Sequence, residues 1–317
     1  MSKIAFIFPG QGAQYVGMAK DFYEASNECK QVFDKAAEVL DFDVKHLCFE
    51  ENEMIHETEY TQAVMVTACL GILASIKPLG ISPEVTAGLS LGEYPALVAC
   101  GAMDAMDAIG LVRKRGLYMA NEVSSGKGAM AAILGLEVTV IEEVCNEVAR
   151  KMQGVVEPAN YNCPGQIVIS GETAAVQAAG ERLLEKKARR VLPLTVSGPF
   201  HSSLLKGAGQ KLGKALEEVK ICSFSIPYAS NVTGTLITDE NEVKELLIKQ
   251  VATSVRWQQC VEAMIAAGVD TFVEIGPGKT LSGFIKKIDR TKTVLNIEKY
   301  EDLEKLRALQ KGETDGK

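Results

Sequence analysis

The stretch between residues 86 and 94 reads Thr-Ala-Gly-Leu-Ser-Leu-Gly-Glu-Tyr. Its centre, residues 88–92 (GLSLG), has the G-x-S-x-G spacing of a nucleophile elbow, a sharp strand-to-helix turn that exposes the serine hydroxyl. Residues 82–87 favour a short strand, and residues 93–100 (EYPALVAC) favour the opening of a buried helix. A helix that begins just after Ser90 aims its dipole at the serine oxygen, which suits an anionic intermediate. Because Gly and Ser also favour ordinary turns, the rest of the chain has to decide whether Ser90 is a nucleophile.

The composition is that of a soluble globular protein with a large core. The chain has 317 residues, 47% hydrophobic and 24% charged, and the mean hydropathy is +0.06. Its net charge of -7 and pI of about 5.3 argue against nucleic-acid binding through overall charge. No run of 18 apolar residues occurs, and the apolar run at residues 4–8 is too short for a signal peptide. We therefore expect a cytoplasmic protein without membrane insertion or a nucleic-acid partner, and we expect a monomer.

The eight cysteines are scattered and form no Cys-x-x-Cys pair. Reduced, mostly buried thiols are typical of a cytosolic protein with this pattern. Only three histidines are present, and none is spaced with a cysteine pair, so we expect no metal site.

Strands alternate with helices along most of the chain, which predicts a mainly parallel sheet flanked by helices, as in a hydrolase-like core. Residues 60–77 are apolar on nearly all faces, as for a buried central helix. Residues 128–196 follow the order β-α-β-β-α-β of a ferredoxin-like unit. We thus expect a large α/β domain at residues 1–125 and 199–310, a ferredoxin-like insert at 126–198, and a flexible tail at 311–317.

A serine nucleophile needs a base, and three histidines are available. His46 and His56 lie in an acidic, irregular stretch, where a solvated surface position is the expected one. His201 lies where the insert returns to the large domain, and domain junctions form the clefts that hold active sites. His201 is therefore the candidate base. The alternative is that His201 lies at a helix N-terminus beside capping serines and has no catalytic role, and the same sequence pattern would fit it.

An anionic intermediate needs amide donors, and a charged substrate needs a counter-charge. The amide of Leu91 follows the nucleophile directly, and the glycine-rich turn at residues 8–14 (FPGQGAQ) allows close backbone approach at Gln11. One arginine aimed into a pocket would bind a carboxylate in bidentate fashion. Spacing alone leaves open whether Arg113 or Arg115 points inward.

Six segments together resemble the malonyl-CoA:acyl carrier protein transacylases of fatty-acid synthesis, over about residues 3 to 300. They are residues 8–14 (FPGQGAQ), 88–94 (GLSLGEY), 113–116 (RKRG), 160–166 (NYNCPGQ), 198–202 (GPFHS) and 274–278 (EIGPG). Each segment is weakly specific alone, but six in the same order are strong evidence of similarity.

The resemblance implies a catalytic role for five residues. By this resemblance, Ser90 would be the nucleophile that becomes acylated, and His201 would be the base that deprotonates it. The backbone amides of Gln11 and Leu91 supply the oxyanion hole. The backbone carbonyl of Gln250 orients the histidine and replaces the aspartate of a catalytic triad.

The resemblance also bears on substrate choice. Arg115 would pair with the free carboxylate of the malonyl group, and Asn160 and Asn162 would lie near the pocket. Phe200, directly before the histidine, accompanies malonyl rather than methylmalonyl units in this family. The chain departs from many members of this family at Leu89, where they carry histidine. The departure puts in doubt only the secondary role that this histidine has in those relatives.

The expected reaction moves a malonyl group from malonyl-CoA to the phosphopantetheine thiol of acyl carrier protein through malonyl-Ser90, with ping-pong kinetics. No permanently bound cofactor is expected, because CoA is part of the substrate and phosphopantetheine arrives on the carrier protein. Two alternatives remain at this point: a serine esterase or thioesterase, and a non-catalytic acyl-CoA-binding module. For carrier docking, the candidate basic segments are residues 186–190 (KKARR) and 286–290 (KKIDR).

Overall fold

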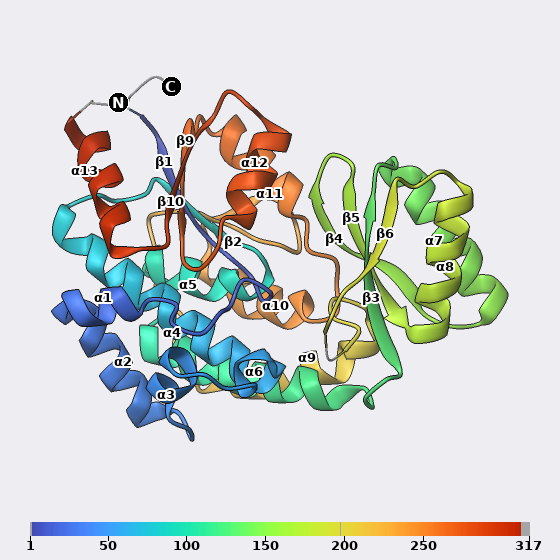
Figure 1. Ribbon diagram of the computed structural model, residues 1–317, viewed down its shortest axis with the longest axis horizontal. Helices are drawn as coiled ribbons and strands as arrows, with labels where there is room; N and C mark the ends of the chain where they lie inside the picture. Colours follow the sequence, from blue (N-terminus) through green and yellow to red (C-terminus); the bar gives the residue numbers. More distant parts are fainter. Residues whose placement is uncertain (1, 197, 312–317) are drawn as a thin grey trace.

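Two β-sheets organise the chain, which a computed structural model describes at residues 2–196 and 198–311. Figure 1 shows the larger, helix-covered sheet on the left and the smaller sheet with its two helices on the right. The smaller sheet is built entirely from residues 128–193. Its chain segment therefore interrupts the larger body in sequence.

The larger sheet has the strand order β10-β9-β1-β2-β7-β8. All neighbouring strands are parallel except β7 and β8, which confirms the expected mainly parallel sheet. The strands are β1 (Ile4–Phe8), β2 (Val85–Gly88), β7 (Tyr228–Ala229), β8 (Leu236–Ile237), β9 (Thr271–Ile275) and β10 (Thr293–Ile297).

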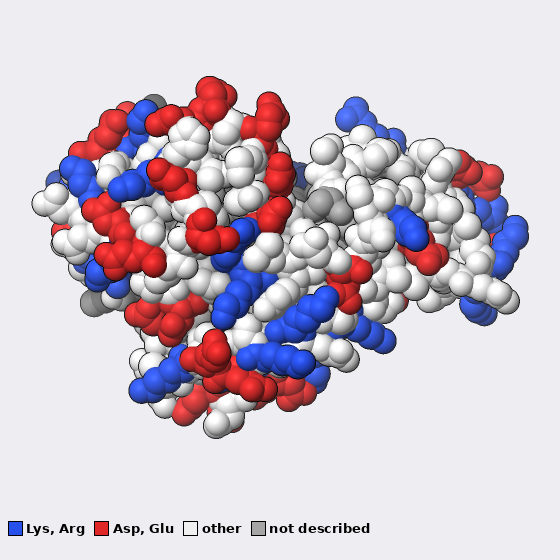
Figure 2. Space-filling model, turned by 90° about the horizontal axis from the view of Figure 1, so that it is seen from below, with Lys and Arg blue, Asp and Glu red and all other residues white. Residues whose placement is uncertain are grey.

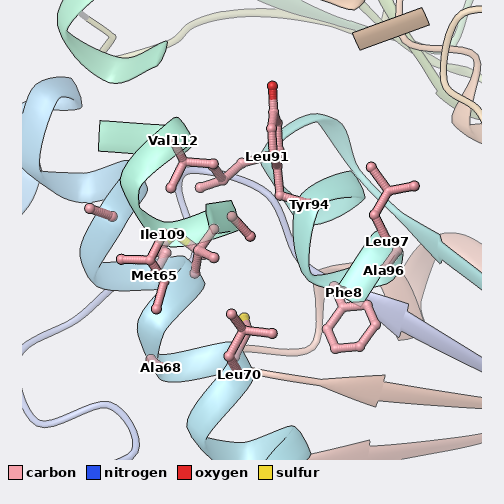
Figure 3. Close-up of a cluster of buried hydrophobic side chains, with 14 of the residues drawn as sticks. Phe8, Met65, Ala68, Leu70, Leu91, Tyr94, Ala96, Leu97, Ile109 and Val112 are labelled. Carbon is pink, nitrogen blue, oxygen red and sulfur yellow. The ribbon is translucent and has the colours of Figure 1, made fainter. Parts of the chain in front are cut away.

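Both faces of this sheet are buried, and alternate residues of β1 serve different cores. Phe6 and Phe8 pack into the larger core, whereas Ala5 and Ile7 face the smaller one. Figure 3 shows Phe8 in the larger core together with side chains from α4, α5 and α6. The helices that contribute to the larger core are α1 (Lys20–Ala25), α2 (Asn27–Val39), α3 (Val44–Phe49), α4 (Thr58–Ile76), α5 (Glu93–Ala99), α6 (Ala105–Glu122), α9 (Lys206–Glu217), α10 (Glu240–Gln250) and α13 (Leu303–Lys311). The opposite face is covered by α11 (Trp257–Ala266) and α12 (Thr280–Ile288).

The most apolar helix, α4, is a core helix. With the 3-10 turn that follows it, the segment Thr58–Leu79 is long and apolar enough by composition to cross a membrane. However, 78% of its apolar window is buried inside the fold, where α4 packs against α2 and α6. Its uniform hydrophobicity therefore reflects contacts on all sides, as expected from the sequence.

The smaller sheet has the antiparallel order β4-β5-β3-β6. Its elements are β3 (Gly128–Leu134), α7 (Val138–Met152), β4 (Val156–Cys163), β5 (Gln166–Glu172), α8 (Thr173–Glu185) and β6 (Arg190–Pro193), in the β-α-β-β-α-β order expected from the sequence. Ile133 and Ile169 pack against α7 and α8 in a core of their own. Met130 and Val168 on the other face belong to the large core and line a cavity.

Strand β4 ties the smaller sheet to the larger body. The Val255 amide donates to the Ala159 carbonyl (2.8 Å), and the Tyr161 amide donates to the Val255 carbonyl (2.9 Å). The Glu157 carboxylate accepts hydrogen bonds from the Ser203 amide (2.8 Å) and hydroxyl (2.7 Å). The second sheet is thus bonded to the segments that follow His201 and Gln250.

Some elements differ from the sequence expectation. The sequence of residues 18–40 has amphipathic patterns that predict helix, and the structure divides this segment at Ser26, whose side chain caps α2 by accepting from the Cys29 amide. The irregular stretch expected around His46 and His56, residues 45–59, instead contains most of α3, which Asp43 caps, a 3-10 turn at Met54–His56 and the start of α4. The sequence of residues 225–229 favours a strand, of which the structure forms only β7. In the part of the chain that the structure describes, further 3-10 turns lie at Lys77–Leu79, Ser90–Gly92, Ser203–Leu205 and Tyr300–Asp302. Of the expected flexible tail, residues 312–317 lie outside the described residues.

Candidate active site

A cavity of about 460 Å³ lies between the two sheets, beyond the carboxyl ends of β1 and β2. Ligands bind at this edge of open parallel sheets. The cavity is lined by nearly all residues singled out from the sequence: Gln11, Leu89, Ser90, Leu91, Arg115, Asn160, Asn162, Phe200 and His201. Gln250 is buried behind His201 and contacts the site through hydrogen bonds.

Ser90 lies on a tight turn that only small neighbours permit. A Cβ atom at Gly88 would lie 1.9 Å from the Gly92 carbonyl group, and one at Gly92 would lie 2.1 Å from the Phe8 carbonyl oxygen. Ser90 itself has a φ of 51°, in the left-handed region that side chains other than glycine rarely adopt. Such strain persists only where the surroundings hold it, and it is typical of functional sites.

Asn231 holds this turn. Its Oδ1 accepts the Ser90 amide at 2.6 Å, and its Nδ2 donates to the Gly88 carbonyl at 2.8 Å. Because Asn231 is fully buried, these bonds form without competition from water. One side chain from the end of β7 thus fixes the elbow of β2.

His201 is positioned as a base toward Ser90. Its Nε2 lies 2.7 Å from the Ser90 Oγ, and its Nδ1 lies 2.8 Å from the Gln250 carbonyl oxygen. A carbonyl oxygen only accepts, so Nδ1 carries the proton and the Nε2 lone pair faces the serine hydroxyl. The arrangement can deprotonate Ser90 as it attacks an electrophile.

Burial keeps His201 neutral. Loss of solvation, with a smaller contribution from the positive charge of Arg115, lowers the pKa of His201 from its ordinary 6.5 to about 4. A base with a lowered pKa is unprotonated, and therefore active, at every pH above that value.

We expect the rate of serine acylation not to decline as the pH falls through 6.5, and to decline only near pH 4. The measurement is the pH profile of kcat/KM for the acyl donor, with circular dichroism at each pH to confirm that the protein stays folded. An acid limb centred near pH 6.5 would contradict the buried, neutral histidine.

Arg115 is the inward arginine. It is 1% exposed, and its NH2 donates to the Ser90 Oγ (3.3 Å) and to the Gln250 Oε1 (3.0 Å), while NH1 donates to the Gln62 Oε1 (2.8 Å). Its Nε has no hydrogen-bond partner within the described chain. The guanidinium therefore offers donors and a positive charge next to the candidate nucleophile.

Arg113 lies on a different side of α6. It pairs with Asp41 at 2.7 Å and stacks over the rings of Phe42 and Tyr60. These contacts give Arg113 a structural role away from the cavity. Of the two arginines, Arg115 is the one that lines the cavity.

The two predicted amide donors approach the cavity from different elements. Gln11 follows β1 and lines the cavity, and its side-chain amide donates to the Thr58 Oγ1 at 2.9 Å. Leu91 is 1% exposed, and Figure 3 shows its side chain between α5 and α6. The packing of this side chain fixes the backbone next to Ser90.

The two remaining histidines are both exposed, as expected. His46 pairs with Glu50 at 3.0 Å on the surface. His56 lines the cavity, a placement that the sequence did not indicate. Leu89, the apolar residue before Ser90 in the elbow, lines the same cavity.

Three polar residues of the site were not singled out from the sequence: Gln62, Glu93 and Asn231. Each is buried and hydrogen-bonded to Arg115, Gln250 or the elbow. A signal existed for two of them. Glu93 is an acid that opens an otherwise apolar helix, and Asn231 follows a strand at the edge where ligands bind.

The site's chemistry is that of acyl transfer. It combines a serine, a neutral histidine, a buried guanidinium and backbone amides, which suit a thioester that also carries a carboxylate. Within residues 2–196 and 198–311, no three His, Cys, Asp or Glu side chains gather into a group that could hold a metal ion.

Comparison with known proteins agrees with this chemistry. The family model described as "Acyl transferase domain" matches residues 5–314. The chain is 44% identical over 316 residues to the malonyl CoA-acyl carrier protein transacylase of Bacillus subtilis, covering 99% of each chain. The crystal structure of the transacylase of that name from Clostridium perfringens is 43% identical with a TM-score of 0.94, covering 98% of each chain. A type II PKS acyl-carrier protein in complex with its malonyl-transacylase gives 37% identity and a TM-score of 0.93, covering 98% of this chain and 100% of the matched chain.

Proposed function

The chain belongs to the family of malonyl CoA-acyl carrier protein transacylases, and from this membership we infer that it moves a malonyl group from malonyl-CoA to the phosphopantetheine thiol of acyl carrier protein. It is an acyltransferase of fatty-acid biosynthesis with no permanently bound cofactor. The observation that carries the assignment is the Arg115 guanidinium, 3.3 Å from a serine oxygen that is itself 2.7 Å from a histidine base.

In the first half-reaction, Ser90 attacks the thioester carbon of malonyl-CoA while His201 Nε2 takes the hydroxyl proton. The amides of Gln11 and Leu91 hold the oxyanion, and Arg115 binds the free carboxylate. The C–S bond then breaks, and protonated His201 returns the proton to the CoA sulfur. The products are malonyl-Ser90 and CoA thiol.

In the second half-reaction, the phosphopantetheine thiol of the carrier protein attacks malonyl-Ser90. His201 removes the thiol proton and then gives it to the Ser90 oxygen as the ester bond breaks. Asn160 and Asn162 on β4 and Phe200 line the cavity. We assign the two asparagines to contacts with the pantetheine chain and Phe200 to contact with the acyl group. A shared serine makes the kinetics ping-pong.

Trapping the acyl-enzyme with malonyl-, methylmalonyl- and acetyl-CoA in parallel tests the assignment. Intact-protein mass spectrometry should find the malonyl adduct in the highest yield, and a carrier thiol should discharge it faster than water does. Release of malonate at a rate equal to transfer would instead favour a thioesterase, and the absence of any adduct would favour a binding module.

Two basic segments that are distant in sequence both lie near Gln166, a residue that lines the cavity. The Arg189 amide donates to the Leu134 carbonyl, next to the Gly135–Gly165 backbone bond at the β4–β5 turn. From α12, the Lys287 Nζ donates to the Gln166 Oε1 at 3.2 Å, and Gln166 lines the cavity. Figure 2 shows basic and acidic side chains interspersed on one face, so the net charge of -7 allows local basic patches. We place the acidic carrier protein at these two segments, called the rim below.

Charge reversal at the rim should weaken carrier turnover. The double variant Arg189→Glu with Lys287→Glu should raise the carrier KM by about 5-fold at low salt, and added salt should shrink the difference. Acylation by malonyl-pantetheine, which carries no nucleotide phosphates, should stay unchanged. Lys35→Glu on α2, another exposed lysine, serves as the control. An unaltered carrier KM in the double variant would exclude this rim.

A cytoplasmic location fits the same proposal. All eight cysteines are free thiols and seven of them are buried, as expected of a protein kept in a reducing compartment.

A further inference from the structure

The site contains a buried carboxylate that the reaction described above does not use. Glu93 opens α5, three residues after Ser90, and is 0% exposed. Its Oε2 accepts from the Gln250 Nε2 at 2.6 Å and from the Asn231 amide at 3.3 Å. Its Oε1 has no hydrogen-bond partner within the described chain. A carboxylate buried in this way needs a counter-charge or a proton.

The counter-charge is Arg115, one amide group away. Gln250 donates to Glu93 through Nε2 and accepts from Arg115 through Oε1 at 3.0 Å. The same Nε2 also donates to the Ser90 carbonyl at 2.9 Å, which fixes the orientation of the amide. In the free enzyme at slightly alkaline pH, one buried cation and one buried anion therefore balance across Gln250.

A malonyl group on Ser90 upsets this balance. Its carboxylate adds a second negative charge next to Arg115, whereas an acetyl group adds none. A nearby like charge disfavours the ionised form of a carboxyl group. Burial already raises the pKa of Glu93 to about 7, so an additional negative charge moves it further toward the protonated form.

Other titratable groups around Glu93 are poorly suited to take the proton. Arg115 of α6 is already protonated, and burial raises the pKa values of Tyr94, Tyr228 of β7 and Cys260 of α11, which keeps them neutral. His201 also faces the acyl group, but its pKa of about 4 lies much further from neutrality.

We propose that Glu93 binds one proton from solvent when Ser90 becomes malonylated, and releases it when the malonyl group leaves. Glu93 is then a positioning residue that lets Arg115 bind a carboxylate without leaving excess charge in the core. The proposal rests on the malonyl transfer described above. No bond other than the Glu93 O–H bond forms or breaks in this step.

Proton counting tests the proposal directly. Enzyme in molar excess is mixed with malonyl-CoA in weakly buffered, slightly alkaline solution containing a pH indicator, and malonyl-Ser90 is quantified in the same sample by mass spectrometry. The wild type should take up a large fraction of one proton per malonyl-Ser90 formed, beyond the contribution of the CoA thiol. Glu93→Gln should show the thiol contribution alone. Glu274→Gln, which removes another fully buried carboxylate that instead caps α12, should retain the wild-type uptake.

A second readout needs no variant, in case Glu93→Gln does not fold. The infrared difference spectrum of the wild type should gain a protonated-carboxyl band that shifts in D₂O on malonylation, and not on acetylation. Full malonyl-Ser90 yield with neither proton uptake nor this band would overturn the role of Glu93, as would equal uptake in Glu93→Gln. Failure to form malonyl-Ser90 at all would contradict the proposed function itself.

Discussion

Ser90→Ala should form no covalent malonyl-enzyme and should lose malonyl transfer by roughly 10⁴- to 10⁶-fold, the cost of removing a nucleophile that acts as a unit with its base. The reason is geometric, since the Ser90 Oγ is 2.7 Å from the His201 Nε2 and lines the cavity. Intact-protein mass spectrometry after mixing with malonyl-CoA measures the adduct.

The control for this variant is Ser82→Ala, which removes an exposed serine before β2 and should keep the full adduct yield. Removal of the Ser90 side chain also leaves the elbow glycines in place, so the fold should persist. A malonyl adduct at full yield in Ser90→Ala would refute the nucleophile assignment.

Arg115→Ala should depress malonyl transfer about 30- to 1000-fold while acetyl transfer falls far less. Truncating one partner of a buried charge pair costs about 2 to 4 kcal/mol, and this variant removes the partner of the malonyl carboxylate. The measured quantity is the ratio of kcat/KM for malonyl-CoA to that for acetyl-CoA, because a ratio within one variant cancels any loss of folded enzyme.

Arg113→Ala is a matched control two residues away. Arg113 pairs with Asp41 outside the cavity, so its loss should lower stability and leave the substrate ratio unchanged. Arg115→Ala should also move the acid limb of the pH profile upward, because Arg115 contributes to the low pKa of His201. Equal losses for malonyl and acetyl groups would eliminate carboxylate binding by Arg115.

The sequence predicted those elements whose pattern is local. The sequence predicts a strand at residues 271–275, a helix at 280–288 and a strand at 293–297, and the structure has these bounds because each apolar run is long enough to show its period. The strands β7 and β8 have two residues each, which is too short to show a hydrophobic period. They form because β7 pairs with β2 and β8 pairs with β7. The polar helix α13 is stabilised mainly by burying Leu303 and Leu306 against a distant core.

In the candidate site too, some residues follow from local motifs and others are brought together only by the tertiary structure. Ser90 and His201 could be identified from short motifs, and the structure places them within hydrogen-bonding distance, while their catalytic roles stay predictions. Arg113 and Arg115 point in different directions because residues two apart on a helix do not share a face, and only the tertiary structure says where the cavity lies. Gln62 acts through its contact with Arg115, 53 residues further along the chain, which no local pattern encodes. The division into a large domain and an insert at residues 126–198 also stays a prediction.

The pairing of Val255 with β4 bears on how relatives could exchange their parts. Gln250 supplies the carbonyl that accepts from His201, and five residues later Val255 forms backbone hydrogen bonds with β4 of the smaller sheet. On the same strand, Glu157 accepts a hydrogen bond from the Ser203 amide, two residues after His201. A chimeric protein that takes residues 126–198 from a relative would therefore also replace β4 and Glu157, which bond to the segments next to His201 and Gln250. To preserve these hydrogen bonds, the exchanged sequence would need to include the segments around residues 203 and 255 together with β4.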